Sequence, residues 1–289
     1  MASRSSSTTH TIKPYLSIRP SSGWQTLDLR EVFQFRDLLF SLAVRDVKLR
    51  YRQTALGALW VLLQPLLGAG ILSFIFNRIA SLPTGGVPPL LFSYVGMLGF
   101  TLFSSTLSKA SSSLVGGSQL VSKIYFPRLI LPLSTILSSL VDYGVGLLML
   151  VVLMVIYRIP PTLALFSMPL WLGLILLLSV GIGLFFSAVM VTYRDVQYVL
   201  PVLISFLTFA SPIAYSVSFV AAKIPTAQRP FYFLFNPVAS LIEALRWSFL
   251  GRSEILWSYV GIASLIAVAV FLFGLVSFRQ MEQKFADVI

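Results

Sequence analysis

ALWVLLQPLLGAGILSFIF, at residues 58–76, is a run of nineteen residues without a charged side chain. The hydrocarbon core of a bilayer is roughly 30 Å thick, and about 20 apolar residues of helix are needed to cross it. Five more stretches of this kind follow, so the sequence predicts an all-α polytopic membrane protein with six transmembrane helices. The predicted spans are residues 58–77, 88–108, 129–157, 170–193, 198–220 and 256–278.

The composition agrees with a single helical domain in lipid. Of the 289 residues, 57% are hydrophobic and 11% are charged, and the mean hydropathy is +0.88, which lies outside the range of soluble proteins. The absence of cysteine excludes disulfides and thiol chemistry. The lone histidine, His10, lies in a Ser/Thr-rich start and is a poor metal ligand or base. We expect residues 1–29 to form a flexible cytoplasmic N-terminus without a cleavable signal peptide.

The basic residues are distributed unevenly about the predicted spans. Of the 21 Lys and Arg, fifteen fall on the side of the two chain ends and six on the other. Lys and Arg concentrate in cytoplasmic segments of membrane proteins, so both termini are predicted to be cytoplasmic. The net charge of +11 is therefore interpreted as a topology signal, and no nucleic-acid-binding module is visible.

Residues 31–53 have the period of an amphipathic helix lying on the cytoplasmic surface. Its polar face has four cations that would meet anionic lipid headgroups. One interpretation is simple anchoring; the other is that these cations also meet a phosphate-bearing lipid substrate as it enters. The four residues are Arg45, Lys48, Arg50 and Arg52.

The predicted cytoplasmic segment at residues 109–128 ends in a compact group of basic and aromatic side chains. These six residues, the basic–aromatic cluster, are Lys123, Ile124, Tyr125, Phe126, Pro127 and Arg128. Exposed aromatic residues beside arginine are typical of protein interfaces, which favours docking. Aromatic residues at headgroup level would give the same pattern, and the pattern alone does not separate the two.

Two polar side chains lie inside predicted spans. Gln64 precedes Pro65 in the first span, where an amide either bonds to a neighbouring helix or contacts substrate. Asp142 lies near the middle of the third span, where an ionised group is costly. No intramembrane Lys, Arg or His offers it a partner, so we expect structural hydrogen bonding, with a functional role as the alternative.

The stretch from residue 211 to residue 251 is too long and too apolar for a plain loop. Asn236 followed by Pro237 is a good helix start, and Gly251 is a good stop. We expect short helices at 237–250 and 217–223, re-entrant or lying on the outer surface, because neither can cross a bilayer.

Catalytic motifs are absent from the sequence. There is no GxxxxGK[ST] phosphate loop, no HExxH and no CxxC, and few carboxylates lie within or between the spans. We therefore expect no bound ATP, no metal site and no enzymatic activity in this chain.

Four segments, in order, resemble the membrane subunits of ATP-binding-cassette (ABC) polysaccharide exporters. They are RDVKLRYRQTALGALWVLLQPL (45–66), KIYFPRLILPL (123–133), TYRDVQYVLP (192–201), and SPIAYSV (211–217) with FNPVASLIEALRWSFLG (235–251). Within this family the chain is most similar to the O-antigen permeases, with capsule and teichoic-acid exporters close behind. The resemblance identifies residues 30–289 as one ABC exporter transmembrane domain.

The resemblance implies a homodimer in the bacterial inner membrane, joined to two separate ATPase subunits that hold ATP and Mg²⁺. It implies a substrate polysaccharide on an undecaprenyl pyrophosphate carrier, ATPase coupling through residues 45–52 and the basic–aromatic cluster, and an outer gate formed by residues 211–223 and 237–250. Aromatic faces would let the polymer slide, although each aromatic residue alone could instead face lipid or the core. The channel and gate candidates are Tyr198, Phe206, Phe209, Tyr215, Phe219, Asn236, Pro237 and Trp247.

Two other functions stay open at the level of sequence. A drug or small-lipid ABC exporter would share the same fold. An ion-coupled secondary transporter would use Asp142, but the inverted repeats expected of such proteins are not evident in the sequence.

Overall fold

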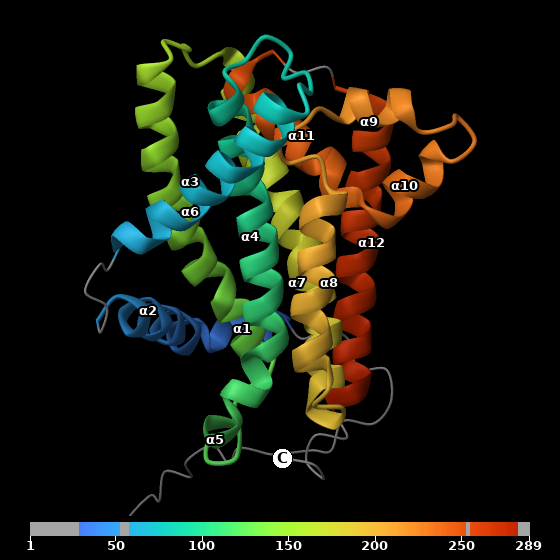
Figure 1. Cartoon of the computed structure of the whole chain (residues 1–289). Coiled ribbons are helices and arrows are strands. Elements are labelled where there is room, and N and C mark those ends of the chain that lie inside the picture. The colour runs from blue at the N-terminus through green and yellow to red at the C-terminus, as the bar shows by residue number, and fades with distance from the viewer. Residues whose placement is uncertain (1–28, 53–57, 253–254, 283–289) are drawn as a thin grey trace, which may run out of the picture.

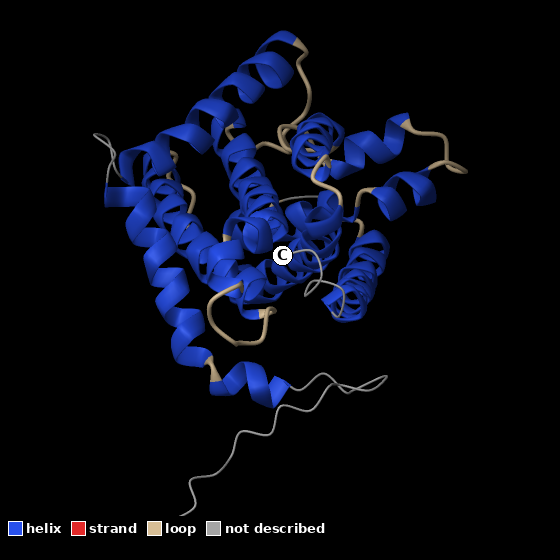
Figure 2. Cartoon of the chain, turned by 90° about the horizontal axis from the view of Figure 1, so that it is seen from below, coloured by secondary structure: helices blue, strands red, loops and turns tan. Residues whose placement is uncertain are grey.

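The computed structural model describes residues 29–52, 58–252 and 255–282, and within these ranges the regular structure is entirely helical (Figures 1 and 2). The predicted N-terminal segment, residues 1–29, lies outside the described residues except for Leu29. The elements are α1 (Leu29–Gln34), α2 (Arg36–Arg52), α3 (Ala58–Ser73), the π-helix η1 (Phe74–Ile79), α4 (Pro89–Gly116), α5 (Ser118–Val121), α6 (Ile130–Ile156), the 3-10 helix η2 (Leu163–Ser167), α7 (Met168–Thr192), α8 (Val196–Ala210), α9 (Val217–Lys223), α10 (Arg229–Phe235), α11 (Pro237–Leu250) and α12 (Trp257–Glu282).

Five helical stretches within the described residues are long and apolar enough to cross a membrane. They are Leu59–Ile79, Pro89–Gly116, Ile130–Ile156, Leu163–Thr192 and Trp257–Glu282. Each overlaps one of the predicted spans. The all-α membrane class is thus confirmed, while the predicted count of six is not.

The predicted fifth span, 198–220, is wrong as one continuous helix. Helix α8 has 15 residues, or about 22 Å at 1.5 Å per residue, which is short of the hydrocarbon thickness. It ends because Ser211 has extended backbone angles, φ −90° and ψ 142°. The ring of a proline disfavours helical geometry in the residue before it, and Pro212 follows directly. Helix α9 then resumes at Val217.

Helices α4 and α7 form the centre of the bundle, and α3, α6 and α12 lie around them with larger exposed faces. Helix α12 packs closely on α7 because glycines meet at the crossing. A Cβ atom added to Gly274 would overlap the backbone oxygen of Gly181, and one added to Gly181 would come within 2.5 Å of the Phe271 Cα. Small residues of this kind let membrane helices approach at backbone distance.

The predicted surface helix, 31–53, is divided at Phe35 into α1 and α2. Helix α2 lies across the bundle near its α5 end (Figure 1). Its apolar side packs on protein, because Leu42 and Ala43 are buried against α6 and the neighbouring core. Phe40 and Leu49 are exposed on the same helix, so apolar residues lie on more than one face of α2.

The predicted loop at residues 109–128 is also partly wrong, because α4 continues to Gly116 and α5 follows. The serine hydroxyls of this segment donate hydrogen bonds to carbonyls of the same helix. Ser111 donates to the Leu107 carbonyl (2.7 Å), and Ser113 donates to the Ala110 carbonyl (2.7 Å). A serine-rich helix end can therefore extend beyond the apolar part of a span.

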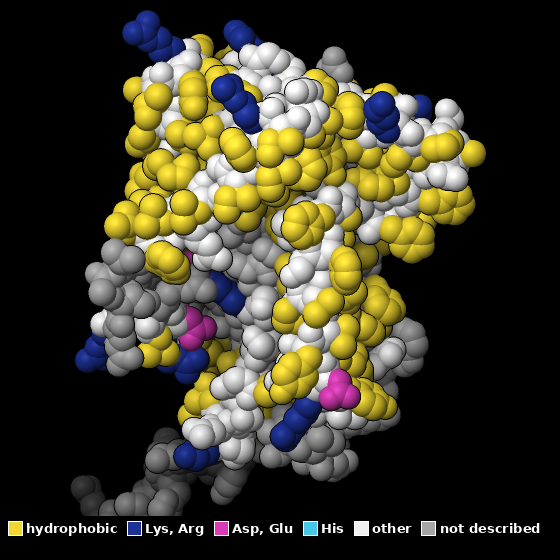
Figure 3. Space-filling view, viewed as in Figure 1, with side chains coloured by type: hydrophobic (Ala, Val, Ile, Leu, Met, Phe, Trp, Pro, Cys, Tyr) yellow, Lys and Arg dark blue, Asp and Glu magenta, His cyan; other side chains and the backbone are white. Residues whose placement is uncertain are grey.

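The surface agrees with a chain embedded in lipid. Hydrophobic side chains cover much of the middle of the face in Figure 3, and most Lys and Arg lie towards its upper and lower ends. The upper end holds α9, α10 and α11, and the lower end holds α5 (Figure 1). These are called the α9 end and the α5 end below.

Candidate functional site

Three groups of polar residues stand out: the basic–aromatic cluster at the α5 end, an ion pair between α4 and α6, and the break between α8 and α9. In the described ranges no three metal-binding side chains come together.

The basic–aromatic cluster is divided between exposed and buried residues. Lys123, Ile124 and Tyr125 are exposed, and Tyr125 has 67% of its surface accessible. Phe126 is buried, 5% exposed, in an apolar cluster that includes Leu129. The structure therefore leaves the first half of the cluster exposed, buries Phe126 and Pro127 and leaves Arg128 partly exposed, a distinction that the sequence pattern does not contain.

Arg128 connects the cluster to the last helix. Its guanidinium donates to the Glu282 backbone carbonyl at the end of α12 (3.0 Å). Glu282 also accepts from Arg279 through its side chain (3.1 Å). Carbonyls in the last turn of a helix lack partners within the helix, so an arginine there satisfies one of them. The loop before α6 is thus attached to α12, 154 residues further along the chain.

Asp142 has the partner that the sequence analysis did not find. The Lys109 ammonium lies 2.8 Å from the Asp142 carboxylate and 2.9 Å from the Ser138 hydroxyl. Lys109 was assigned to the loop after the second span, but it lies inside α4. The two side chains are only 19% and 13% exposed. The same ammonium also donates to the Ser139 hydroxyl (3.4 Å).

We expect Lys109→Met to destabilise the protein by up to about 3 kcal/mol, the low end of the range for buried ion pairs, because it removes one partner of a largely buried ion pair and leaves the other charge in place. The charge exchange Lys109→Asp with Asp142→Lys should recover part of this loss. Thermal unfolding of the detergent-solubilised protein measures both effects, and Lys123→Met, on an exposed lysine, is the matched control. Equal midpoints for Lys109→Met and Lys123→Met would contradict a structural role for the pair.

At the α9 end, the broken backbone between α8 and α9 is held by side chains from three other elements. The Ala210 carbonyl accepts from the Tyr232 hydroxyl (2.7 Å) and the Asn236 amide (3.2 Å). The Ala214 carbonyl accepts from the Asn77 amide (3.1 Å) on η1. Burial raises the pKa of Tyr232 from an ordinary value that is already above physiological pH. Non-helical backbone at membrane depth persists only where such partners replace water.

Arg246 supplies two further hydrogen bonds to the break. Its guanidinium donates to the Pro212 carbonyl (3.0 Å) and the Ile213 carbonyl (2.8 Å). It also pairs with Glu243 one turn earlier on α11, and both side chains are essentially inaccessible, at 0% and 1% exposed. The guanidinium carbon lies 3.8 Å from the centre of the Phe92 ring, a cation–π contact.

The sequence analysis did not identify Glu243 and Arg246 as a pair. The available signal was a Glu and an Arg three residues apart within an apolar helix, a spacing that places both on one face. A second signal was Gly96 on α4: a Cβ there would lie 2.5 Å from the Arg246 Nη2 atom and would overlap the Ile213 carbonyl oxygen. Only glycine leaves room for the guanidinium and the turn together.

The predicted helix at 237–250 is α11 with the same bounds, and that at 217–223 is α9. Twelve of the fourteen residues of α11 are buried, so α11 belongs to the core. Three predicted gate residues lie on α11 or beside it. The Asn236 amide donates to the Ala210 carbonyl at the break, and Pro237 is the first residue of α11. The Trp247 ring meets the Trp257 ring edge to face, with 5.3 Å between the ring centres.

The other predicted channel residues are not brought to one place. Tyr198, Phe206 and Phe209 are exposed along α8, in which only Leu200 is buried. Tyr215 is half-buried, and its hydroxyl donates to the Phe209 carbonyl (3.2 Å). Phe219, the fifth aromatic candidate, lines a pocket at the α9 end.

Four more predicted residues, Gln64, Arg45, Lys48 and Arg52, lie on the surface. Gln64 is exposed on α3 rather than bonded into the bundle of this chain. On α2, Arg45 pairs with Asp46 (3.0 Å), and Lys48 and Arg52 are exposed. Arg50 lies on the same helix, but its side chain is outside the described part of the structure.

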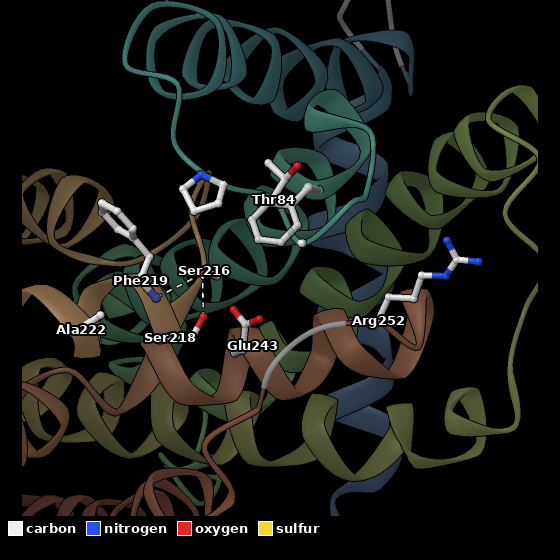
Figure 4. Close-up of a pocket in the computed structure, with 10 residues that line it drawn as sticks. Thr84, Ser216, Ser218, Phe219, Ala222, Glu243 and Arg252 are labelled. Atoms are coloured by element: carbon white, nitrogen blue, oxygen red, sulfur yellow. Dashed lines mark hydrogen bonds between the residues drawn. The ribbon is translucent and has the colours of Figure 1, made fainter.

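A pocket of about 290 Å³ lies between the loop before α4, α9 and α11. In Figure 4 the Glu243 carboxylate extends from α11, with Ser218 and Phe219 of α9 on one side and Thr84 opposite. Ser216 and Ser218 share a hydrogen bond (2.9 Å). We refer to this space as the α9–α11 pocket. Its lining is Pro83, Thr84, Gly85, Phe92, Ser216, Ser218, Phe219, Ala222, Glu243 and Arg252.

Comparison with known proteins gives one family and several relatives. Residues 37–250 match the ABC-2 type transporter family. The chain is 28% identical over 263 residues to the O-antigen export system permease protein RfbA of Myxococcus xanthus, covering 90% of this chain and 98% of that protein. It is 25% identical over 256 residues to RfbA of Klebsiella pneumoniae, covering 88% and 95%. It is 27% identical over 259 residues to the polysialic acid transport protein KpsM of Escherichia coli, covering 84% and 93%.

Proposed function

The chain belongs to the ABC-2 type transporter family, and from this premise we propose that it is the permease subunit of an exporter that moves lipid-linked polysaccharide, such as O-antigen, across the bacterial inner membrane. Similarity to O-antigen and polysialic acid export permeases over most of the chain carries the proposal. Undecaprenyl pyrophosphate is the proposed lipid carrier, and this chain has no catalytic role.

The charge distribution supports an orientation. The side predicted to be cytoplasmic holds fifteen of the 21 Lys and Arg. It includes the basic–aromatic cluster and therefore corresponds to the α5 end. We assign the α5 end and both termini to the cytoplasm, and the α9 end to the outer side.

The energy source is proposed to be two separate ABC ATPase subunits that hold ATP and Mg²⁺, because this chain has no phosphate loop of its own. The exposed residues Lys123, Ile124 and Tyr125 are the docking surface that best fits such a partner. The attachment of Arg128 to the end of α12 gives a physical route by which movement of the docked loop reaches a spanning helix.

We expect Lys123→Glu with Tyr125→Ala to reduce copurification of the ATPase strongly, since the pair removes an aromatic anchor and reverses a charge at an exposed site. The matched control is Tyr157→Ala with Arg158→Glu, which makes the same kind of change at exposed residues of the other end. Copurification of the Lys123/Tyr125 variant at the wild-type level would exclude this surface as the docking site.

A second copy of the chain is the proposed partner for the exposed side of α8. Leu200 is the one buried residue of α8, whereas a helix in a packed bundle buries a whole face. Its aromatic residues Tyr198, Phe206 and Phe209 would then line a path shared by the two copies. Gln64, an exposed amide on a spanning helix, offers a polar contact across such an interface.

The entry of the lipid carrier is proposed at α2. Arg45, Lys48 and Arg52 are exposed on this helix and would meet the pyrophosphate at the cytoplasmic surface, together with Arg50. Membrane lipid is the alternative contact for the same cations.

Deletion of the gene tests the whole proposal. Loss of surface polysaccharide, with the lipid-linked polymer retained inside and restored by the wild-type gene, is the expected result. Unchanged surface polysaccharide would instead favour a drug or small-lipid exporter of the same family. The ion-coupled alternative is disfavoured by the family and by the Lys109–Asp142 ion pair, which occupies the carboxylate it requires.

A further inference from the structure

We propose that α10 is a lipid-binding helix, whose exposed apolar side lies in the membrane leaflet at the α9 end. The four residues of this side, called the α10 face below, are Pro230, Phe231, Leu234 and Phe235. The inference goes beyond the proposed function, because it requires only that the chain spans a membrane. None of the four residues lines the α9–α11 pocket.

The α10 face is apolar throughout and strongly exposed. Phe231, Leu234 and Phe235 have 63%, 51% and 80% of their surfaces accessible. Their spacing, i, i+3 and i+4, places them on one side of a helix. The other side of α10 packs on the protein, since Phe233 is buried and Tyr232 is partly buried. The α10 face is therefore left for a partner from outside the chain.

Two contacts fix the depth of α10 relative to the membrane helices. The Phe233 ring stacks on the Tyr259 ring, with 4.0 Å between the ring centres, and Tyr259 lies in the first turn of α12. The Tyr232 hydroxyl donates to the carbonyl of Ala210, the last residue of α8. Helix α10 thus lies level with the end of a spanning helix, where hydrocarbon meets lipid headgroups. Phe and Leu on the apolar side are typical of helices that lie in this interface.

Polar and apolar groups are separated across the segment formed by α9, α10 and the loop between them. In Figure 3, hydrophobic side chains project from the lower edge of this segment, towards the apolar middle of the molecule, and Lys and Arg lie along its upper edge. Lys223 is exposed at the end of α9, and Gln228 is exposed in the loop. Insertion of the lower edge into the leaflet buries apolar surface and leaves the cations at the level of anionic headgroups.

The composition of the α10 face favours lipid over a second copy of the chain. Membrane helices pack on one another through small residues or hydrogen-bonding side chains, and Pro230, Phe231, Leu234 and Phe235 provide neither. A fully buried Phe covers about 150–250 Å², so these four partly exposed side chains remain well below the roughly 800 Å² that each partner of a stable interface buries. Fluid acyl chains adapt to bulky side chains and require no minimum area.

Electron paramagnetic resonance of single spin labels tests the proposal, because the chain has no native cysteine. Phe231→Cys and Phe235→Cys are each labelled with a nitroxide in the full chain, in nanodiscs of phosphatidylethanolamine and phosphatidylglycerol. Oxygen concentrates in hydrocarbon, and nickel ethylenediaminediacetate stays in water, so their collision rates with the label report its surroundings. We expect oxygen collisions to exceed nickel collisions at both positions, as at Leu265→Cys, an exposed position within α12.

The matched control is Ala227→Cys, on an exposed alanine in the loop before α10, where nickel collisions should exceed oxygen collisions. An excess of nickel collisions at Phe231 or Phe235 would overturn the proposal, because the α10 face would then lie in water. Low collision rates with both reagents would overturn it as well, since protein would then cover the face, and dipolar broadening between labels would identify that protein as a second copy. Either result leaves the export function untouched, because deletion of the gene tests that function separately.

Discussion

Arg246→Met is expected to lower the stability of the fold by about 3–5 kcal/mol, which is the range found when one partner of a buried ion pair is removed. The substitution leaves the Glu243 carboxylate buried without the guanidinium, and it removes the donor from the Pro212 and Ile213 carbonyls. Methionine retains much of the side-chain volume, so the loss reports charge and hydrogen bonding rather than a cavity. Thermal unfolding followed by tryptophan fluorescence in detergent, together with the yield of monodisperse protein, measures the effect.

A double variant separates the two parts of this loss. Glu243→Gln with Arg246→Met removes the unpaired charge but still leaves two carbonyls without their donor, so its midpoint should lie between those of the wild type and Arg246→Met. Arg252→Met, on an exposed arginine nearby, is the control and should be close to wild type. If Arg246→Met unfolds at the same temperature as Arg252→Met, Arg246 does not hold the break.

Gly274→Ala is expected to destabilise the packing of α12 on α7 by about 3 kcal/mol, at the upper end of the usual cost of overpacking. The added methyl group would overlap the backbone oxygen of Gly181, which cannot rotate away as a side chain could. Gly181→Ala should behave alike, because its Cβ would lie 2.5 Å from the Phe271 Cα. We expect a lower unfolding midpoint and less protein in the membrane fraction.

Two other glycines on the same helices provide matched controls. Gly173 on α7 and Gly261 on α12 have no heavy atom within 4 Å of an added Cβ. Gly173→Ala and Gly261→Ala should be neutral or slightly stabilising, since alanine also has the better helix propensity. A uniform response of all four variants would show that helix propensity, and not backbone contact, governs the effect.

The membrane class and several helices could be predicted because their signals are local. The charge-free run at 58–76 requires no knowledge of its neighbours to predict α3, and Pro237 and Gly251 mark the two ends of α11 locally. The Asn236 side chain, predicted as the cap, makes no hydrogen bond to the start of α11 and bonds to the Ala210 carbonyl instead. The predicted span at 198–220 was wrong although its apolar length was sufficient. Pro212 lies within it, and whether such a proline bends a helix or ends it depends on what accepts the freed carbonyls.

The candidate sites were predicted only in part, and for a related reason. Lys109 and Asp142 are 33 residues apart, and pairing them requires the length of α4 and its rotation relative to α6. The cluster at 123–128 was found as a unit, but Phe126 and Tyr125 are adjacent and differ from 5% to 67% exposed. That difference arises from the packing of Phe126 beside Leu129, which no local pattern encodes.

The sequence by itself determined that this chain is helical, lies in a membrane, and has short helices at 217–223 and 237–250. These properties follow from apolar length, charge and capping residues, which act within a few turns of helix. Only the tertiary structure decided where α8 stops, which charges are paired and which aromatic residues are exposed. The physical reason is that a polar group in an apolar interior must find a partner, and the partner of the Ile213 carbonyl, Arg246, lies 33 residues away on another helix.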